Sequence, residues 1–383
     1  MTVKDANPSS THPPLPPTSE ADMFHRLRLL RSRRVGISTY QRLLIEHGTA
    51  QNALAALPQV ARAAGVENYE ICPEAVIEAE LNAGAKAGAG LLARGAPGYP
   101  EALNDLPDAP PFLWLIGDPE LLQKPAIALV GARNASSLGL RMARGLARDL
   151  GETGFVVVSG LARGIDAAAH KAAMPTGTIA VQAGGVDVMY PAENTGLAAE
   201  IAAQGLRLSE QPMGLQPIAR HFPARNRIIS ALGQATIVVE AAAKSGSLIT
   251  ARDALDIGRD VLAVPGHPID PRAAGCNMLI RDGATLVRNA NDVIEALSPI
   301  APQAAPELPL VPPPTPPKDK RSLRETANLH SQILARLGPA PTAEDQLIRD
   351  LESTAEGVTP ALLELELEGQ IERQPGGLLT RTR

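Results

Sequence analysis

The stretch FVVVSGLARGIDAAAHKAA, residues 155–173, contains a short apolar run, a glycine turn and an alanine-rich segment. A continuous run of branched apolar residues is typical of a strand that is buried on both faces of a sheet. Glycine after such a strand permits the tight turn that leads into a helix. The stretch therefore predicts a strand–turn–helix unit, the repeating element of a parallel α/β sheet.

The same pattern recurs on both sides of this stretch. The other apolar runs are IALVG (127–131), TIAVQAGG (178–185), LRLSE (206–210), TIVVE (236–240) and DVLAVPG (260–266), with ATLV (284–287) as a candidate edge strand. Apolar runs that alternate with helical segments indicate a doubly wound sheet. We expect an α/β fold, an extended Rossmann-like and mostly parallel sheet, over residues 91–298.

The flanks of this region have a different composition. Residues 1–20 and 299–320 are rich in proline, and we expect a disordered tail and a linker there. Residues 21–90 show only helical patterns, and VGISTYQRLLIEHG (35–48) favours a helix with Ser38 as its N-cap and Gly48 as its stop. This part is predicted to be a helix-hairpin-helix or sterile-alpha-motif (SAM) unit, with a plain helical bundle as the alternative.

Residues 321–383 predict three helices and a hairpin around Gly376–Gly377, which is typical of a winged helix. Winged helices often bind duplex DNA, but three glutamates crowd the predicted recognition helix and would repel phosphates. They are Glu364, Glu366 and Glu368. We expect a protein contact or weak DNA binding from this domain.

The composition excludes several classes of protein. The 383 residues carry a formal charge of −5, and neither a signal-peptide core nor an apolar run of the roughly 20 residues needed to span a bilayer is present. The two cysteines, Cys72 and Cys276, form no CxxC motif. We therefore expect a cytoplasmic protein without a membrane segment, disulfide framework or metal site.

Ligands of open α/β sheets bind where the strands end. Glycine-containing turns with a nearby cation follow three of the predicted strands, at GARNAS (131–136), SGLARGID (159–166) and EAAAKSGSLIT (240–250). Such turns let backbone amides approach phosphate oxygens. The cations expected at this edge are Arg133, Arg163 and Lys244.

The stretch HFPARNRIIS (221–230) adds an aromatic ring to these cations. Pro223 disfavours helical backbone at Phe222, so the helix is expected to begin near Ala224 and to end at Gly233. Its first turn, where free amides attract anions, would hold Arg225, Asn226 and Arg227. Phe222 is expected to stack on an unpaired base, or alternatively to plug the space under the helix.

Motifs of catalysis and cofactor binding are absent from the sequence. There is no HExxH and no GxSxG, GARNAS is not GxGxxG, and KSGS lacks the upstream glycine of an ATP-binding loop. Asp166 and His170 have the spacing of a catalytic pair, but Asp166 is better explained as a helix N-cap with His170 on the surface. Glu210 and Glu240 are expected to orient arginines. We expect no cofactor and no catalytic residues.

Several of these motifs occur together, in this order, in one family. The segments SGLARGIDAAAHKAA, GTIAVQAGGVDVMYPAEN, HFPARNRIIS, EAAAKSGSLITARDALDIGRDVLAVPG and LIRDGATLV resemble the DNA-processing protein A (DprA/Smf) family of bacteria. This resemblance implies a homodimer that binds single-stranded DNA and helps to load the RecA recombinase during natural transformation. It implies no established chemical reaction.

Carried over residue by residue, the resemblance places the DNA-binding pocket on Arg133, Ser159, Gly160, Arg163, Phe222, Arg225, Asn226, Arg227 and Lys244. It places a dimer or recombinase surface on Leu279, Ile280 and Leu286. The alternative is a nucleotide-processing hydrolase similar to the lysine-decarboxylase-like phosphoribohydrolases. Their PGGxGTxxE motif corresponds here to EAAAKSGSLIT, which has Lys244 and no following acid.

Overall fold

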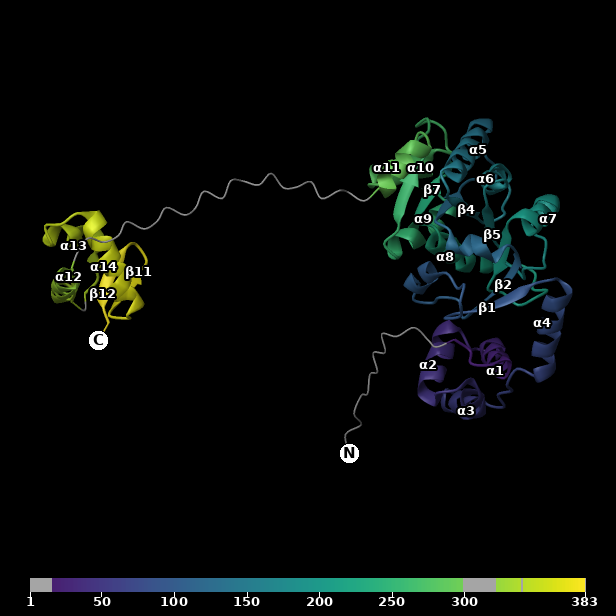
Figure 1. The fold of residues 1–383 in the computed structure, drawn as a ribbon, viewed down its shortest axis with the longest axis horizontal. Helices are drawn as coiled ribbons and strands as arrows, with labels where there is room; N and C mark the ends of the chain where they lie inside the picture. The colour runs from purple at the N-terminus through teal and green to yellow at the C-terminus, as the bar shows by residue number, and fades with distance from the viewer. Residues whose placement is uncertain (1–15, 299–321, 339, 383) are drawn as a thin grey trace. The chain divides into compact units, whose positions relative to one another are not determined.

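The computed structural model describes residues 16–298, 322–338 and 340–382. They belong to two compact units, which divide between residues 299 and 300 (Figure 1). The linker predicted at 299–320 and most of the tail predicted at 1–20 lie outside the described residues. The first helix, α1, begins at Glu20.

The first unit is built on a nine-stranded sheet with the order β1-β2-β6-β5-β4-β3-β7-β8-β9. Its strands are β1 Gly90–Ala93, β2 Phe112–Gly117, β3 Ala126–Val130, β4 Val156–Ser159, β5 Thr178–Val181, β6 Leu206–Ser209, β7 Ala235–Val238, β8 Asp260–Ala263 and β9 Thr285–Leu286. All pairs from β6 to β9 are parallel, so the expected mostly parallel sheet is confirmed. The strand order reverses beside β3: strands β4 to β6 follow on one side of β3, and β7 to β9 follow on the other side.

Two strands at one edge were not predicted. Strands β1 and β2 pair with each other in an antiparallel ladder, and β2 pairs with β6 in the same sense. They lack the strand–glycine–helix pattern that marks the parallel strands, because a short 3-10 turn and a loop connect them.

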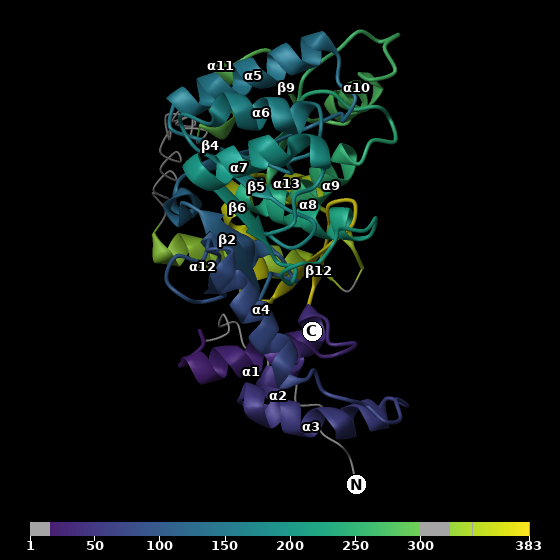
Figure 2. The same ribbon diagram turned by 90° about the vertical axis from the view of Figure 1, so that its right-hand side faces the viewer.

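Helices cover both faces of the sheet, which explains why most residues of the parallel strands are apolar. Val157 of β4 contributes to the core beneath α5 Ser137–Glu152, α6 Ile165–Ala173 and α11 Ala290–Leu297. Val156 and Val158 contribute to the opposite core, beneath α8 His221–Leu232, α9 Ser247–Asp256 and α10 Ala274–Arg281. Helix α7 Thr195–Gln204 lies with α5 and α6, and the three are stacked one above the other in Figure 2.

Helix α8 begins earlier than its sequence predicted. It starts at His221, so Phe222 has helical backbone and Pro223 is the third residue of the helix. Proline is tolerated there because the amides of the first turn have no partner within the helix. The predicted stop at Gly233 is confirmed, since its amide closes the last turn onto Ile229.

The N-terminal part of the first unit consists of four helices, α1 Glu20–Arg31, α2 Ile37–His47, α3 Ala50–Ala63 and α4 Glu74–Lys86. Helix α2 begins after Gly36, so Ser38 lies inside the first turn and the expectation that it is the N-cap was wrong. Gly48 ends α2 with a φ of 75°, as predicted. The tight connection from α2 to α3 forms a helical hairpin.

A buried polar joint connects this helical part to the sheet. Trp114 of β2 donates from Nε1 to Glu80 Oε1 of α4 at 2.9 Å. Arg31 of α1 binds the same carboxylate through Nε, 2.9 Å from Oε2, and through Nη2, 2.8 Å from Oε1. A Cβ atom on Gly84 would lie 2.4 Å from the indole ring, so this close approach requires glycine.

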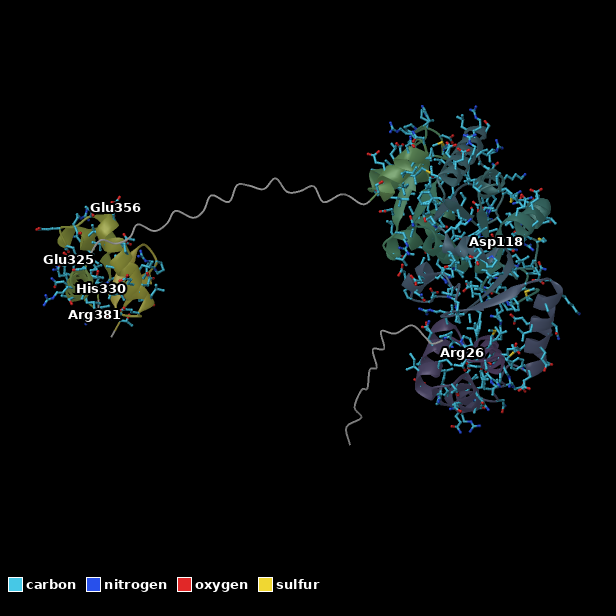
Figure 3. All side chains as sticks on the ribbon, in the orientation of Figure 1. Arg26, Asp118, Glu325, His330, Glu356 and Arg381 are labelled. Atoms are coloured by element: carbon cyan, nitrogen blue, oxygen red, sulfur yellow. The ribbon has the colours of Figure 1, made fainter. Side chains whose placement is uncertain are left out.

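The second unit contains α12 Leu323–Arg336, α13 Glu344–Asp350 and α14 Ala355–Leu367, with a small sheet of β10 Thr342–Ala343, β11 Ile371–Gln374 and β12 Leu378–Arg381. The three helices and the β11–β12 hairpin confirm the predicted winged helix. His330 Nε2, labelled in Figure 3, lies 3.2 Å from Glu364 Oε2, and Arg373 pairs with Glu344 and Glu366. Of the three predicted helix glutamates, Glu366 thus shares Arg373 with Glu344, and Glu368 accepts from Gln370 Nε2 at 2.9 Å.

We predict that Glu80→Ala destabilises the first unit by about 3–5 kcal/mol, because it leaves Arg31, whose side chain is only 13% exposed, without its counter-charge. The measurement is thermal unfolding followed by calorimetry. Glu74→Ala is the matched control, since its carboxylate binds Arg28 with 60% of its side chain exposed and should contribute at most about 1 kcal/mol. Equal shifts for the two variants would contradict the prediction.

Candidate functional site

Two pockets open at the carboxyl edge of the parallel strands, and they share the residues Arg133, Ala162, Phe222 and Arg225. The first, which we call the switch pocket, has a volume of about 550 Å³ and lies between the turns that follow β3 and β7. The second, the side pocket, has a volume of about 390 Å³ and lies over the turns that follow β4 and β5. The switch pocket therefore occupies the place where strand order reverses, the usual ligand site of such sheets.

The partition between the two pockets is an aromatic ring with a cation on it. The guanidinium carbon of Arg133 lies 5.2 Å from the centroid of the Phe222 ring, within the range of a cation–π contact. The ring of Tyr190, which lines the side pocket, lies next to the ring of Phe222, with 5.7 Å between the ring centroids and an interplanar angle of 51°. Phe222 is half-buried and belongs to none of the buried apolar clusters of the described residues. This position favours the stacking interpretation over the plug.

Arg225 is buried, which corrects the expectation of a free cation in the first turn. Its Nη1 donates to the carbonyl of Gly160 at 2.6 Å and to that of Val181, and its Nε donates to Asn226 Oδ1 at 3.2 Å. Burial lowers the pKa of Arg225 to about 10, so the group is still charged at neutral pH. A Cβ on Gly160 would lie 2.5 Å from this guanidinium, and glycine is therefore required there.

The turn after β4 directs its amides into the protein. The amides of Gly160 and Ala162 donate to Asp166 Oδ2 at 3.1 and 3.3 Å. The amide of Leu161 donates to His170 Nε2 at 3.3 Å. These three amides are therefore not available to phosphate oxygens, contrary to the expectation for this glycine turn.

Asp166 and His170 are both buried, and neither matches its predicted place. Gly164, not Asp166, is the N-cap residue of α6, and the ring of His170 is fully buried rather than on the surface. His170 Nδ1 lies 2.7 Å from Thr178 Oγ1, which donates its own proton to Val157 O, so Nδ1 carries the ring proton. Burial lowers the pKa of His170 to about 3, in agreement with a neutral ring.

Arg227 is held by two carboxylates, which removes it from the predicted phosphate-binding set. Its Nη2 lies 2.6 Å from Glu210 Oε2 and its Nε lies 3.0 Å from Asp108 Oδ2. Its side chain is only 12% exposed. The expectation that Glu210 orients an arginine is confirmed.

Two further residues hold the strand ends in place. Ser159 is fully buried and its hydroxyl donates to Leu129 O at 2.7 Å, so this side chain cannot reach a ligand as predicted. Glu240 accepts from the amide of Ser136 at 3.0 Å and lies 3.4 Å from Arg272 Nε. Glu240 therefore fixes the turn after β3 and orients an arginine that sequence reasoning missed.

The cations that remain exposed at the pockets are Arg133, Arg163 and Lys244, together with Arg272. Arg163 lies 3.5 Å from Glu193, and the two side chains are 59% and 61% exposed. Because solvent screens such an exposed ion pair, it does not hold either side chain in one position. Asn226 lines the switch pocket beside them. Gln182 and Tyr190 of the side pocket were also missed, although both lie within a segment that carries the family resemblance.

The surface predicted for dimerisation lies at the side of the sheet that ends with strand β9. Leu279 and Ile280 of α10 are half-buried and pack against the core of their own chain. Leu286 of the edge strand β9 is 41% exposed. In the described ranges, no helix is long and apolar enough to span a membrane, and no three His, Cys, Asp or Glu residues are grouped to hold a metal.

Three family descriptions match the chain. "DNA recombination-mediator protein A" matches residues 90–298, the "DprA-like N-terminal HHH domain" matches 20–83, and the "DprA winged helix domain" matches 312–377. The helix-hairpin-helix (HHH) match decides against the sterile-alpha-motif alternative for the N-terminal helices.

Named relatives agree with these matches. Protein Smf of Synechocystis is 36% identical over 307 residues, which are 73% of this chain and 77% of that protein. DNA processing protein DprA of Streptococcus pneumoniae is 46% identical over 198 residues, 51% of this chain and 70% of that protein. Its crystal structure superposes with a TM-score of 0.62 at 35% identity, covering 71% of this chain and 97% of that one.

A second solved structure is DNA processing protein A from Helicobacter pylori, described with its single-stranded DNA binding mode. It superposes with a TM-score of 0.51 at 34% identity and covers 55% of this chain and 95% of that chain.

We predict that Arg227→Ala destabilises the protein by about 3–5 kcal/mol at neutral pH, because Glu210 would then be a buried charge without a partner. Burial already raises the pKa of Glu210, and Arg227 opposes this rise. In the variant the pKa rises further, so the loss should be largest well above the ordinary glutamate value of about 4.3 and should shrink as the pH falls and the carboxyl binds a proton.

The measurement is the free energy of unfolding of Arg227→Ala and wild type between pH 5 and 8. The double variant Arg227→Ala/Glu210→Gln should recover most of the loss at neutral pH. A loss that is the same at every pH would show that the ion pair does not have this role.

Proposed function

The chain belongs to the DNA recombination-mediator protein A (DprA/Smf) family, and we propose that it binds single-stranded DNA across the two pockets at the carboxyl edge of its sheet. The observation that carries the proposal is the partition between the pockets, where Arg133 lies on the Phe222 ring. A base can stack on such a ring while the guanidinium holds a neighbouring phosphate. The Helicobacter pylori protein, which binds single-stranded DNA, has the same fold at 34% identity.

Exposed side chains supply the cations of this site. Arg133, Arg163 and Lys244 are exposed at the pocket mouths, whereas the amides after β4 are bonded internally. The whole chain has a formal charge of −5, so the attraction is local. Screening limits each charge to about 8 Å at physiological salt, and these cations act on a strand that lies against them.

Single strands are favoured over duplexes for a steric reason. A half-buried ring between two pockets can stack only on a base whose face is free, and a duplex hides its base faces. The predicted recognition helix of the winged helix, α14, does not attract a duplex, since it carries Glu364 and Glu366 and is followed by Glu368.

We propose that the strand is held without a chemical step. The hydrolase alternative needs a catalytic glutamate after the β7 turn, where this chain has Lys244 and a run of small residues before α9. Release of free base from nucleoside monophosphates by the purified protein would favour the hydrolase instead.

We propose further that the protein acts as a homodimer that passes the strand to the RecA recombinase. The exposed Leu286 on the edge strand β9 supports the dimer, because an unpaired strand edge is a ready surface for a second copy. The family description as a recombination mediator supports the recombinase. These partners would place the protein in the cytoplasm.

We predict that Phe222→Ala weakens binding of a single-stranded oligonucleotide by about 1–3 kcal/mol, the contribution of one stacked base. Arg133→Ala should also reduce the dependence of log Kd on log salt by about 0.7, the value for one phosphate contact with a single strand. The measurement is fluorescence anisotropy over a range of salt concentrations, with a duplex of the same sequence as comparison.

Lys171→Ala is the matched control, because Lys171 is exposed near the opposite end of α6 from the pockets. Its salt dependence should equal that of the wild type. Equal affinity of the wild type for duplex and single strand, or an unchanged slope in Arg133→Ala, would contradict the proposed function.

For the dimer, we predict that Leu286→Asp shifts the protein to a monomer, because it places a charge on an apolar contact. The measurement is sedimentation velocity. Val76→Asp, which changes a 49% exposed residue of α4, should leave the mass unchanged. A wild-type protein that sediments as a monomer would remove the dimer from the proposal.

A further inference from the structure

A row of arginines lies on the outer face of helix α5, which begins beside the switch pocket. Arg141, Arg144 and Arg148 have the i, i+3, i+7 spacing that places side chains on one face of a helix. All three are exposed, whereas residues that face the sheet, such as Leu146 and Leu150, are buried. We call this row the α5 stripe. It is about 10 Å long, since an α-helix rises about 1.5 Å per residue.

The charge of the α5 stripe is not neutralised within the described part of the chain. No carboxylate pairs with Arg141 or Arg144 there, and Arg148 pairs with its neighbour Asp149 through side chains that are 63% and 42% exposed. Water screens such an exposed pair, so it holds neither group in place. A row of arginines without internal partners favours a polyanion, because a guanidinium can bind a phosphate through two parallel hydrogen bonds.

Arg272 connects the α5 stripe to the switch pocket. It lines the pocket, and its Nε lies 3.4 Å from Glu240 Oε1. The same carboxylate accepts from the amide of Ser136, the N-cap of α5, at 3.0 Å, so Arg272 lies beside the start of that helix. Its Nε and Nη2 bind Asp270, while its Nη1 makes no hydrogen bond within the described residues. Exposed cations therefore continue from the pocket, past the start of α5, onto the outer face of the helix.

The composition of this face favours a nucleic acid backbone over a protein. Along α5, all of which lies in the described part of the chain, Leu138 is the one large apolar residue that is exposed, at 66%. A protein partner would need a larger apolar centre. Leu138 precedes Arg141 by three residues, so it borders the α5 stripe and offers a contact to a sugar. The turn after β3 lines the switch pocket and leads directly into α5, so the stripe continues that site.

We propose that the α5 stripe binds the phosphates of the single strand beyond the nucleotides held in the two pockets, with Arg272 as the connecting cation. This inference rests on the proposed binding of single-stranded DNA. It adds a second segment to the binding surface. Since α5 contains no aromatic residue, this segment contributes charge without stacking. The affinity gained there depends on strand length and on salt, and not on base sequence.

The test is a length series of oligodeoxythymidylates from about 4 to about 16 nucleotides, the range of site sizes known for single-strand-binding domains. Fluorescence anisotropy with the full chain gives the Kd of each strand over a range of salt concentrations. In Arg141→Ala/Arg144→Ala, the slope of log Kd against log salt should fall by about 1.4 for the longest strand, because two phosphate contacts of about 0.7 each are lost. The shortest strand that binds measurably should keep the wild-type slope, since it occupies the pockets alone.

Two further variants are the controls. Lys124→Ala/Lys171→Ala removes the same charge from exposed positions before β3 and near the end of α6, which lie at the amino edge of the sheet. This variant should keep the wild-type slope at every length. Arg141→Lys/Arg144→Lys keeps both charges, so it should retain the slope for the longest strand. Thermal unfolding should be the same for all of these variants, because every changed side chain is exposed.

The outcomes separate this inference from the function on which it rests. An unchanged slope for the longest strand in Arg141→Ala/Arg144→Ala would overturn the role of the α5 stripe and leave binding in the pockets intact. An equal loss of slope for the shortest and the longest strand would assign both arginines to the pocket site and would also overturn it. A wild-type protein that binds no single strand of any length would instead overturn the proposed function.

Discussion

The buried guanidinium of Arg225 is the interaction on which the carboxyl edge of the sheet depends. It comes from the first turns of α8 and donates to carbonyls at the ends of β4 and β5, those of Gly160 and Val181. One side chain thus holds a helix and two strand ends in register. Since Phe222 precedes it by three residues in the same helix, the position of the ring between the two pockets follows from this contact. The cost of burying the charge is offset by hydrogen bonds and by the field of Asp166, which raises the pKa of Arg225 while burial lowers it.

The turn after β4 shows how a glycine turn at a strand end can be occupied from within. Asp166 and His170 accept its three successive amides, and Leu161 is held there at a φ of 56°, in the left-handed region. A nest of amides that would otherwise bind an anion is closed by a carboxylate and an imidazole of the same chain. The amides of this turn therefore offer no anion site, and the cations exposed at the two pockets include the side chains of Arg133, Arg163 and Lys244.

Much of the fold could be predicted from the sequence because its strands are buried on both faces. Most parallel strands then have a short run of apolar residues, and glycine follows several of them, although β6 contains Arg207 and neither β6 nor β7 is followed by glycine. β1 and β2 carry no such mark, since they pair in an antiparallel ladder without a helix between them. Ser38 and Asp166 were assigned to the wrong positions at helix starts because N-cap preferences decide a boundary only to within a residue or two.

The candidate site was harder to predict, and the arginines of α8 show why. Arg225 and Arg227 are two positions apart in one helix and have the same local chemistry. One meets carbonyls of β4 and β5, and the other meets Glu210 and Asp108. These partners are distant in sequence. The local spacing therefore could not tell an arginine that is bonded within the protein from one that is free to bind a ligand. Gln182 was missed for a related reason, because the residues that line a pocket are known only once the fold is known.

The Phe222 ring has one more consequence. Because Phe222 lines both pockets, a rotation or displacement of its ring alters both of them together. Whatever occupies one pocket by moving the ring must change the affinity of the other, and thermodynamic reciprocity makes the two effects equal in size. The affinity for a single strand that fills both pockets then depends on the two bound nucleotides together. The contributions of neighbouring nucleotides to the binding free energy are therefore not additive.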